Sequence, residues 1–241
     1  MDPFLTGNPK ASTSADKLDC DIICITHGHG DHLGDAVDIA RRTGATIASI
    51  VELSDWLEKT GVKSVGFNMG GSTKIGGTTI TMVPAFHSSS IGAPGLEFSA
   101  AMAVGMVISS GKVVYHAGDT CVFGDMGIIG GLYKPDVALL PIGGFFTMDP
   151  VQAGLAVSLI RPKVAVPMHY GTWPQIEQDP QEFAKIVKKN FAQAKVEELA
   201  SVGIPTTSLA ALNQLGHLAA RSKRPRRTKV AILKPGESLE V

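Results

Sequence analysis

Three of the seven histidines of the chain lie in the stretch Thr26 to Asp35, which reads THGHGDHLGD and follows an apolar run. In an extended segment, side chains two residues apart point the same way. His27 and His29 are therefore expected to present two imidazoles to one point, while Asp31 and His32 face a neighbouring point. The intervening glycines leave room for a tight turn. This pattern predicts two adjacent sites for transition-metal ions.

A transition metal in a protein takes about four nitrogen, oxygen or sulfur ligands, so this stretch alone does not complete two sites. His87 follows the apolar run ending in VPAF, Asp119 lies in HAGDT after VVYH, and His169 follows VAVPM. Each comes directly after a candidate strand, where α/β sheets gather their active-site residues. Taken singly, each is explained as well by a hydrogen-bonded histidine or a turn aspartate. Together they favour a metal centre.

The elements that must position these residues follow an α/β pattern, because short β-branched runs alternate with amphipathic stretches. Gly76-Gly77 and Ser110-Gly111 are typical of hairpin turns, so part of the sheet is expected to be antiparallel. The predicted strands are Asp21 to Thr26, Thr46 to Ile50, Ser64 to Phe67, Thr78 to Pro84, Met102 to Ser109, Lys112 to His116, Val137 to Pro141, Val164 to Met168 and Val230 to Leu233. The predicted helices are Leu33 to Thr43, Leu53 to Lys59, Pro150 to Ile160 and Pro180 to Ala200.

Composition bounds the classes of function. The 22 basic residues balance 22 acidic ones, and only 6% of residues are aromatic, so neither nucleic acid nor a membrane surface is an expected partner. No apolar run has the length of a membrane span, and the first residues do not form a signal peptide. Three cysteines without a CxxC pair fit a reducing compartment. These features predict a cytoplasmic protein.

The combination of HGHGDH, a separate His, GDT and a late His resembles the metallo-β-lactamase superfamily. DPFLTGNP, PAFHSSS, YHAGDT, LLPIG, PMHY and LKPGESLE further resemble, in this order, metal-dependent hydrolases related to the L-ascorbate-6-phosphate lactonase branch. The likeness covers Asp2 to about Lys189 and again Lys229 to Val241. It implies an α/β fold of the four-layered αβ/βα sandwich type, with a binuclear metal site at one edge of its two sheets.

The resemblance also implies how the ligands are shared between two divalent ions. One ion would be held by His27, His29 and His87, the other by Asp31, His32 and His169, with Asp119 bridging the two. Asp2 would lie behind the ligands and hydrogen-bond the metal loop. Zinc is the expected metal, with manganese, iron and nickel as alternatives.

The implied reaction is hydrolysis. Two cations lower the pKa of a shared water, and the bridging hydroxide attacks an ester, lactone or phosphoester. Asp31 is expected to act as a proton shuttle as well as a ligand. Two alternatives stay open: a nuclease or phosphodiesterase of the same superfamily, and a truncated metal-binding pseudoenzyme.

The chain departs from the family pattern in three places. Relatives begin with a β-hairpin before DPFLTGNP, so the first hairpin is expected to be missing, and a homo-oligomer is one way to cover the exposed sheet edge. Residues 190–228 form an atypical insertion, expected to be partly disordered, within one domain spanning residues 1–241; its basic run RSKRPRRTK is interpreted as a solvated loop. Gly144 and Phe145 stand where relatives place Asp and Asn.

Two further residues near the expected site are assigned without metal contact. His116 lies within a predicted strand and is interpreted as structural. Cys121, two residues after the expected bridging aspartate, is interpreted as an apolar filler. Tyr170, Thr172 and Trp173 either bound the substrate or pack in the core.

Overall fold

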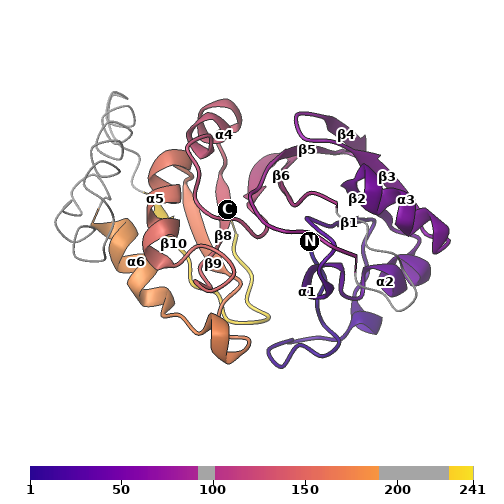
Figure 1. Ribbon diagram of the computed structural model, residues 1–241, viewed down its shortest axis with the longest axis horizontal. Helices are drawn as coiled ribbons and strands as arrows, with labels where there is room; N and C mark the ends of the chain where they lie inside the picture. The colour runs from indigo at the N-terminus through magenta and orange to yellow at the C-terminus, as the bar shows by residue number, and fades with distance from the viewer. Residues whose placement is uncertain (92–100, 190–227, 241) are drawn as a thin grey trace. The chain divides into compact units, whose positions relative to one another are not determined.

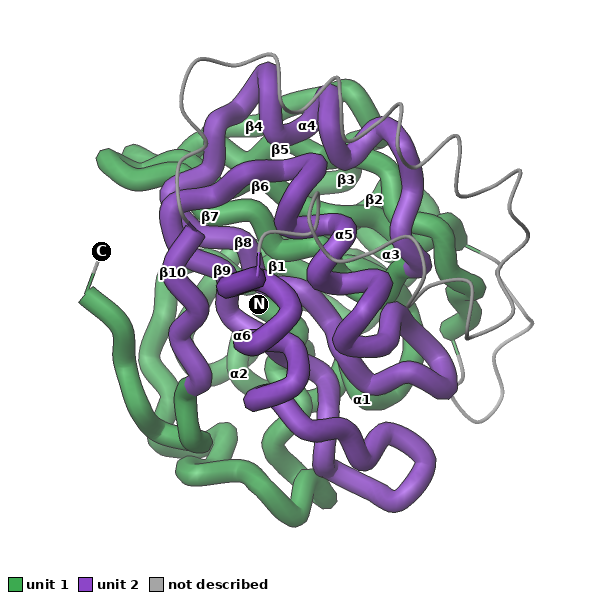
Figure 2. The backbone as a smooth tube through the Cα atoms, turned by 90° about the vertical axis from the view of Figure 1, so that its left-hand side faces the viewer, with its two compact units in different colours: residues 1–120, 233–240 green, residues 121–232, 241 purple. Residues whose placement is uncertain are grey.

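The computed structural model describes residues 1–91, 101–189 and 228–240. The chain divides into two compact units, shown in different colours in Figure 2. The first unit contains residues 1–120 with 233–240, and the second contains residues 121–232 with 241. The single domain expected from the sequence stays a prediction.

The first unit begins with a three-stranded parallel sheet in the order β1-β2-β3 (Figure 1). Ile23 pairs with Ile47, and Ala48 pairs with Val65. Helix α3 packs against β2 and β3. The elements are η1 (Ala15–Lys17), β1 (Ile22–Cys24), α1 (Gly30–Leu33), α2 (Ala36–Thr43), β2 (Thr46–Ile50), α3 (Val51–Lys59) and β3 (Lys63–Phe67).

An antiparallel ribbon follows in the same unit. It consists of β4 (Ser72–Ile75), β5 (Thr78–Pro84), β6 (Val104–Ser110) and β7 (Lys112–His116). The two predicted hairpins are present, because β4 pairs with β5 across Gly76-Gly77 and β6 pairs with β7 across Gly111. Gly76 and Gly111 have φ values of 57° and 75°, a left-handed conformation that glycine adopts without steric cost.

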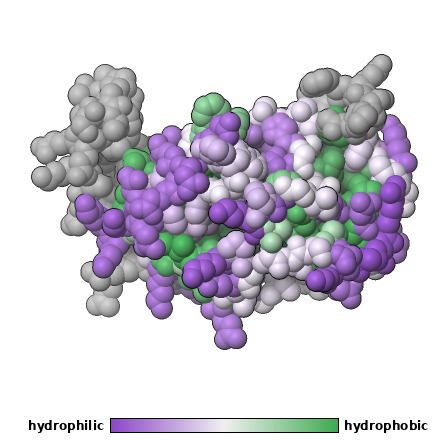
Figure 3. All heavy atoms as spheres, turned by 90° about the horizontal axis from the view of Figure 1, so that it is seen from below, coloured by the Kyte–Doolittle hydropathy of each residue, from purple (hydrophilic) through white to green (hydrophobic). Residues whose placement is uncertain are grey.

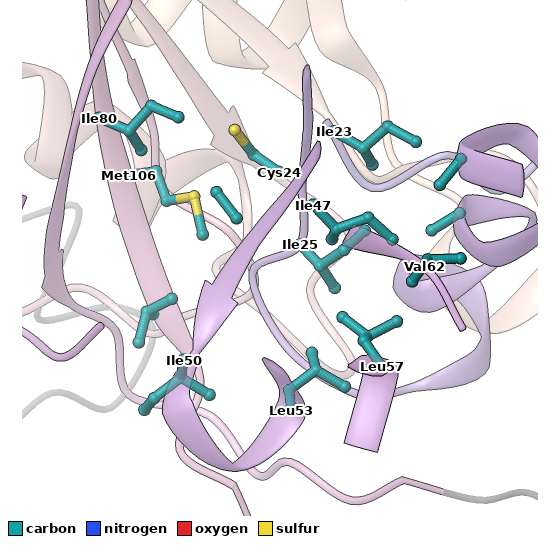
Figure 4. Close-up of a cluster of buried hydrophobic side chains, with 14 of the residues drawn as sticks. Ile23, Cys24, Ile25, Ile47, Ile50, Leu53, Leu57, Val62, Ile80 and Met106 are labelled. Atoms are coloured by element: carbon teal, nitrogen blue, oxygen red, sulfur yellow. The ribbon is translucent and has the colours of Figure 1, made fainter. Parts of the chain in front are cut away.

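The core of the first unit lies between these two groups of strands. Figure 4 shows side chains of β1 and β2 beside Ile80 of β5 and Met106 of β6. Ile47, Ile80 and Met106 are fully buried, and Leu57 adds the inner face of α3. Residues from both groups of strands therefore share one apolar cluster, which holds the carboxyl end of β1 in place.

The second unit contains the parallel strands β8, β9 and β10, with β9 paired to both of the others. Helix α5 begins with Pro150 after the N-cap Asp149, whose carboxylate accepts the N–H of Gln152 at 2.7 Å. The elements are α4 (Met126–Tyr133), β8 (Val137–Pro141), α5 (Pro150–Ile160), β9 (Val164–Met168), η2 (Pro174–Ile176), α6 (Pro180–Lys188) and β10 (Lys229–Val230).

Most predicted elements agree with the structure, and the differences have local causes. The predicted helix Leu33 to Thr43 is two helices, because Gly34 between α1 and α2 has a φ of 43°. Strand β4 and helix α4 were not predicted, since β4 is short and polar and three of the eight residues of α4 are glycines. Of the predicted helix Pro180 to Ala200, residues 190–200 lie outside the described residues, as does nearly all of the 190–228 insertion.

On the face drawn in Figure 3, hydrophilic side chains are interspersed with small apolar patches. Among the described helices, none has the length and hydropathy that crossing a membrane requires.

Substitutions at two adjacent residues of α3, one buried and one exposed, test the core of the first unit. Leu57 is fully buried, whereas Glu58 is exposed. Replacing Leu57 by Ala should lower the free energy of unfolding by about 2–5 kcal/mol, because it removes buried methyl groups and leaves a cavity. Glu58→Ala should change it by less than about 0.5 kcal/mol. Denaturant unfolding measures both, and equal effects would contradict the assigned core.

Candidate metal centre

The loop after β1 is anchored on both sides by backbone hydrogen bonds. Ile25 donates its N–H to the carbonyl of Ala48 in β2 at 3.0 Å, and the carbonyl of Thr26 accepts the N–H of Val104 in β6 at 3.0 Å. Both Ile25 and Thr26 are fully buried. The loop that begins at His27 is therefore attached to both groups of strands in the first unit.

Gly28 and Ser89 bring the loop of His87 close to this stretch. The Ser89 hydroxyl accepts the N–H of Gly28 at 3.2 Å. A Cβ atom at Gly28 would lie 2.8 Å from the carbonyl oxygen of Ser90, so only glycine fits there. At Gly30, by contrast, an added Cβ would meet no atom within 4 Å. Of the two glycines in the motif, Gly28 is therefore the one that close packing of the loops requires.

Three imidazoles converge beyond this contact. His27, His29 and His87 each offer a ring nitrogen, and these nitrogens all lie within 4.8 Å of one another. His27 Nε2 lies 3.0 Å from His29 Nδ1. The rings of His27 and His29 are 5.2 and 5.3 Å from the ring of His87, between centroids. The structure thus brings together the three histidines that the sequence analysis assigned to one ion.

A second group is made by His27, His32 and Asp119, whose ligand atoms also lie within 4.8 Å of one another. Asp119 follows β7, and its Oδ2 is 3.3 Å from His32 Nε2 and 3.7 Å from His87 Nε2. One carboxylate oxygen therefore lies near a histidine of each predicted set. Asp31 Oδ2 is 3.6 Å from His32 Nε2.

The Asp2 carboxylate lies behind these ligands. Its Oδ1 accepts the N–H of Thr26 at 2.8 Å, and its Oδ2 accepts the Thr26 hydroxyl at 2.7 Å and His32 Nδ1 at 2.9 Å. The Thr26 hydroxyl is also 3.0 Å from His27 Nδ1. Since its single proton goes to Asp2, His27 Nδ1 must be the donor in that contact.

These hydrogen bonds decide which nitrogen of two histidines faces the centre. With Nδ1 donating to Thr26 in His27 and to Asp2 in His32, the Nε2 atoms are left for ligation. Asp2 has a φ of 41°, a strained conformation for a residue with a side chain. Contacts with neighbouring residues therefore hold Asp2 in a conformation that its own backbone does not favour.

Asp35 supplies those contacts. Its Oδ2 accepts the N–H groups of Leu5 and Thr6, both at 2.9 Å, and its own N–H is donated to the carbonyl of Pro3 at 2.9 Å. A Cβ at Gly34 would lie 2.3 Å from that carbonyl oxygen, so the two backbones are in direct contact. The segment after Asp2 is thereby fastened to the end of the histidine motif.

The pKa values of the two buried histidines, His27 and His32, are shifted in opposite directions. Burial, with a smaller contribution from His32, lowers the pKa of His27 to about 3, so this imidazole is neutral and able to bind a metal. Burial also acts to lower the pKa of His32, but its hydrogen bonds to Asp119 and Asp2 raise it to about 10. Burial raises the pKa of the Asp2 carboxyl, yet the hydrogen bond and charge of His32 hold it well below its usual range.

The donor set fits divalent transition ions. Imidazole nitrogens and carboxylate oxygens are ligands of zinc, manganese, iron and nickel, and three of the candidate ligands, His27, His32 and Asp119, are buried. Without a cation, one proton on His32 is what neutralises part of the charge of Asp2 and Asp119. A metal ion would displace that proton and take over the neutralisation.

His169 belongs to the second unit, where it follows β9 directly and has a φ of 56°. Its ring lies 6.2 Å from that of Trp173, measured between centroids. Its assignment to the second ion stays a prediction. A Cβ at Gly143 would lie 2.6 Å from the His169 carbonyl oxygen, and Gly144 has a φ of 82°, a left-handed conformation that glycine adopts without steric cost.

Sequence reasoning missed the hydroxyls that order the ligand loops. The Thr26 hydroxyl forms hydrogen bonds with both Asp2 and His27, and the Ser89 hydroxyl accepts the N–H of Gly28. The Thr120 hydroxyl accepts the N–H of Phe86 at 3.0 Å, directly before His87. Their place in the sequence could have indicated this role, because each hydroxyl lies within two residues of an expected ligand. Cys121 is exposed, which does not fit its interpretation as an apolar filler.

Comparisons with known proteins point to one family. A family model described as a beta-lactamase superfamily domain matches residues 2–170. A UPF0173 metal-dependent hydrolase of Methanopyrus kandleri is 53% identical over 191 residues, covering 78% of this chain and 83% of the relative. Another UPF0173 metal-dependent hydrolase, from Methanosarcina mazei, is 44% identical over 242 residues, covering 100% of this chain and 90% of the relative.

Solved structures give the same result. A novel metallo hydrolase from the hyperthermophilic archaeon Ignicoccus hospitalis is similar with a TM-score of 0.74 and 38% identity, covering 99% of this chain and 88% of that one. The metallo-beta-lactamase fold protein YhfI from Bacillus subtilis is similar with a TM-score of 0.55 and 17% identity, covering 74% of this chain and 73% of that one. The second likeness concerns the fold alone.

The two glycines of the motif form a matched pair of variants. Gly28→Ala should weaken metal binding by about 10-fold or more, because the methyl group displaces the loop between His27 and His29. Gly30→Ala should leave the affinity within about 2-fold, since the added methyl group meets open space. Calorimetric titration of the metal-free proteins with zinc compares them. A Gly28→Ala variant with unchanged affinity would contradict the close packing.

The Asp2 carboxylate should make stability depend on pH. Its pKa is lowered on folding, so its contribution is present above the pKa of the unfolded chain, about 4, and is lost as the pH falls below that value. In Asp2→Asn, the unfolding free energy of metal-free protein at pH 7 should fall by roughly 3 kcal/mol and its decline between pH 5 and 2 should flatten. Asp38→Asn removes an exposed carboxylate and should leave the profile unchanged. Denaturant titrations across this pH range decide the matter.

Proposed function

The chain belongs to the beta-lactamase superfamily and to its metal-dependent hydrolases, and from this premise we propose that it uses two divalent cations to hydrolyse an ester, lactone or phosphoester bond in a small molecule. The predicted superfamily and the α/β metallo-β-lactamase fold are confirmed by these matches. The number of ions, their identity and the substrate are the parts that we propose.

The position of Asp119 carries the proposal. Its Oδ2 lies 3.3 Å from a nitrogen of His32 and 3.7 Å from a nitrogen of His87. A carboxylate that served one ion would have no need to approach ligands of both predicted sets. This arrangement supports a bridging role for Asp119 between a His27, His29, His87 site and a second site that includes Asp31 and His32.

When bound, two divalent cations would lower the pKa of a shared water and polarise the bond that is attacked. The chain contributes orientation and proton transfer. Asp2 and Thr26 hold the imidazoles of His27 and His32 with Nε2 toward the centre. Asp31 has a side chain that is 27% exposed, whereas that of Asp119 is 4% exposed, so Asp31 is the carboxylate able to exchange a proton with solvent.

Zinc is the proposed metal of the first site, because three imidazoles make up its set of unshared ligands. The second site is richer in carboxylate oxygen, which also suits manganese or iron. Esters, lactones and phosphoesters share an electrophilic centre that gains negative charge on oxygen when it is attacked, and such charge is what a cationic site stabilises.

Metal content and turnover test the proposal together. Purified protein should hold up to two equivalents of zinc or manganese, and chelation should abolish hydrolysis in a screen of lactones, esters and phosphodiesters. His29→Ala and Asp119→Ala should each lose at least one equivalent and lower kcat/KM by about 1,000-fold or more, because each disrupts a ligand set. Asp38→Ala, which removes an exposed carboxylate, serves as the control.

The outcomes distinguish the alternatives left open by the sequence. Full metal content in both ligand variants would show the ligand assignment to be wrong. Turnover confined to nucleic-acid substrates would favour the nuclease or phosphodiesterase, and metal binding without turnover on any substrate would favour the pseudoenzyme.

A further inference from the structure

His116 is a buried histidine that the proposed chemistry does not use. It is the last residue of β7, pairs with Met106 of β6, and is 7% exposed. It stands three residues before Asp119 in YHAGDT and is not among the clustered metal-binding groups of the described residues. From the sequence it was interpreted as structural.

Its side chain makes a specific contact with the turn that follows. The Nδ1 atom accepts the backbone N–H of Gly118 at 3.1 Å. A side-chain acceptor that binds the N–H two residues later closes a small ring, as aspartate and asparagine do in Asx-turns. This ring spans His116 to Gly118 and so restrains the backbone torsions immediately before Asp119.

Gly118 has little freedom to compensate if this restraint is lost. Its φ is 63°, and a Cβ atom there would lie 2.8 Å from the carbonyl oxygen of Val104 and 3.0 Å from Thr26 Cβ. The turn is therefore packed against Thr26, whose hydroxyl contacts both Asp2 and His27. A change in its path would displace Asp119 relative to the histidines.

The imidazole must stay neutral for Nδ1 to accept a hydrogen bond, with its proton on Nε2. Burial lowers the pKa of His116 to about 4, although the charge of Asp2 opposes this shift. The acceptor is thus available throughout the neutral range.

We propose that His116 is a positioning residue, whose Nδ1 holds the turn at Gly118 and thereby places the Asp119 carboxylate between the two metal sites. The inference rests on the proposed function, because it assigns His116 a part in presenting a ligand. A residue that merely filled the core would be replaceable by an apolar side chain of similar size.

Three variants separate the hydrogen bond from the packing. In His116→Asn the amide oxygen can take the place of Nδ1. In His116→Leu the acceptor is lost and the apolar volume is kept. In His116→Gln the side chain stays polar but its amide lies one atom further out, at the position of Nε2. Should the Leu variant fail to fold, the comparison of Gln with Asn carries the test.

Cobalt(II) is the probe, because its d–d absorption spectrum reports ligand geometry without requiring turnover. The Leu and Gln variants should bind cobalt about 10-fold or more weakly and with an altered spectrum, while the Asn variant should return within about 3-fold of wild type. With any substrate found in the screen, the loss in Leu and Gln should fall on kcat and leave KM within about 3-fold. Amide hydrogen exchange at Gly118 in metal-free protein should be slow in wild type and Asn and fast in Leu and Gln.

Several results would overturn the inference. It fails if Leu or Gln binds cobalt with wild-type affinity and spectrum, or if Asn is as impaired as Leu, since packing would then explain the effect. If wild-type protein binds no cobalt, zinc or manganese, the proposed function itself fails and the positioning role fails with it, even where the Gly118 amide is protected. If metal binds normally and only Gly118 exchange changes, the hydrogen bond exists but does not position the ligand.

Discussion

The buried carboxylate of Asp2 is the constraint on which the centre depends. A charged group removed from water is tolerated only when hydrogen bonds and opposite charge replace its hydration. Asp2 obtains these from the N–H and hydroxyl of Thr26 and from Nδ1 of His32. Because each of these donors adjoins or belongs to a candidate metal ligand, satisfying the carboxylate also sets the orientation of the imidazoles. The same contacts therefore stabilise the fold and orient the candidate ligands in this part of the chain.

The same principle extends to the loops that carry the other ligands. Each is tied by a side chain to a backbone N–H near a candidate ligand: Ser89 to Gly28, Thr120 to Phe86 and His116 to Gly118. Such local contacts fix a loop at little cost in side-chain entropy, because serine and threonine have few rotamers to lose. Rigidity at the site thus comes from many small restraints around the ligands, while the apolar cluster of β1, β2, β5 and β6 holds the strands from which the loops begin.

The clustering of the candidate ligands was easier to predict from the sequence than the contacts that hold them. His27, His29 and His32 are recognisable because their spacing is unusual, and β2, β5, β7, β8 and β9 have the predicted bounds because apolar β-branched runs identify strands. Helix α4 escaped prediction because its glycines obscure the helical period. The roles of Thr26 and Ser89 escaped for a different reason. A single hydroxyl in a loop is typical of any turn, and only the distance to a partner many residues away, as from Ser89 to Gly28, distinguishes one that orders a site.

Charge balance is consistent with the two ions proposed above. Asp2, Asp31 and Asp119 bring three negative charges to the centre, and the histidines bring none once a cation replaces the proton of His32. A single divalent ion that displaced this proton would leave the centre with a net negative charge, which opposes the charge that develops on oxygen during hydrolysis. Two divalent ions leave one positive charge, which stabilises it. The third carboxylate, Asp2, matters here although it binds no ion in our assignment, because without it the centre would carry a further positive charge and hold its anionic product more tightly.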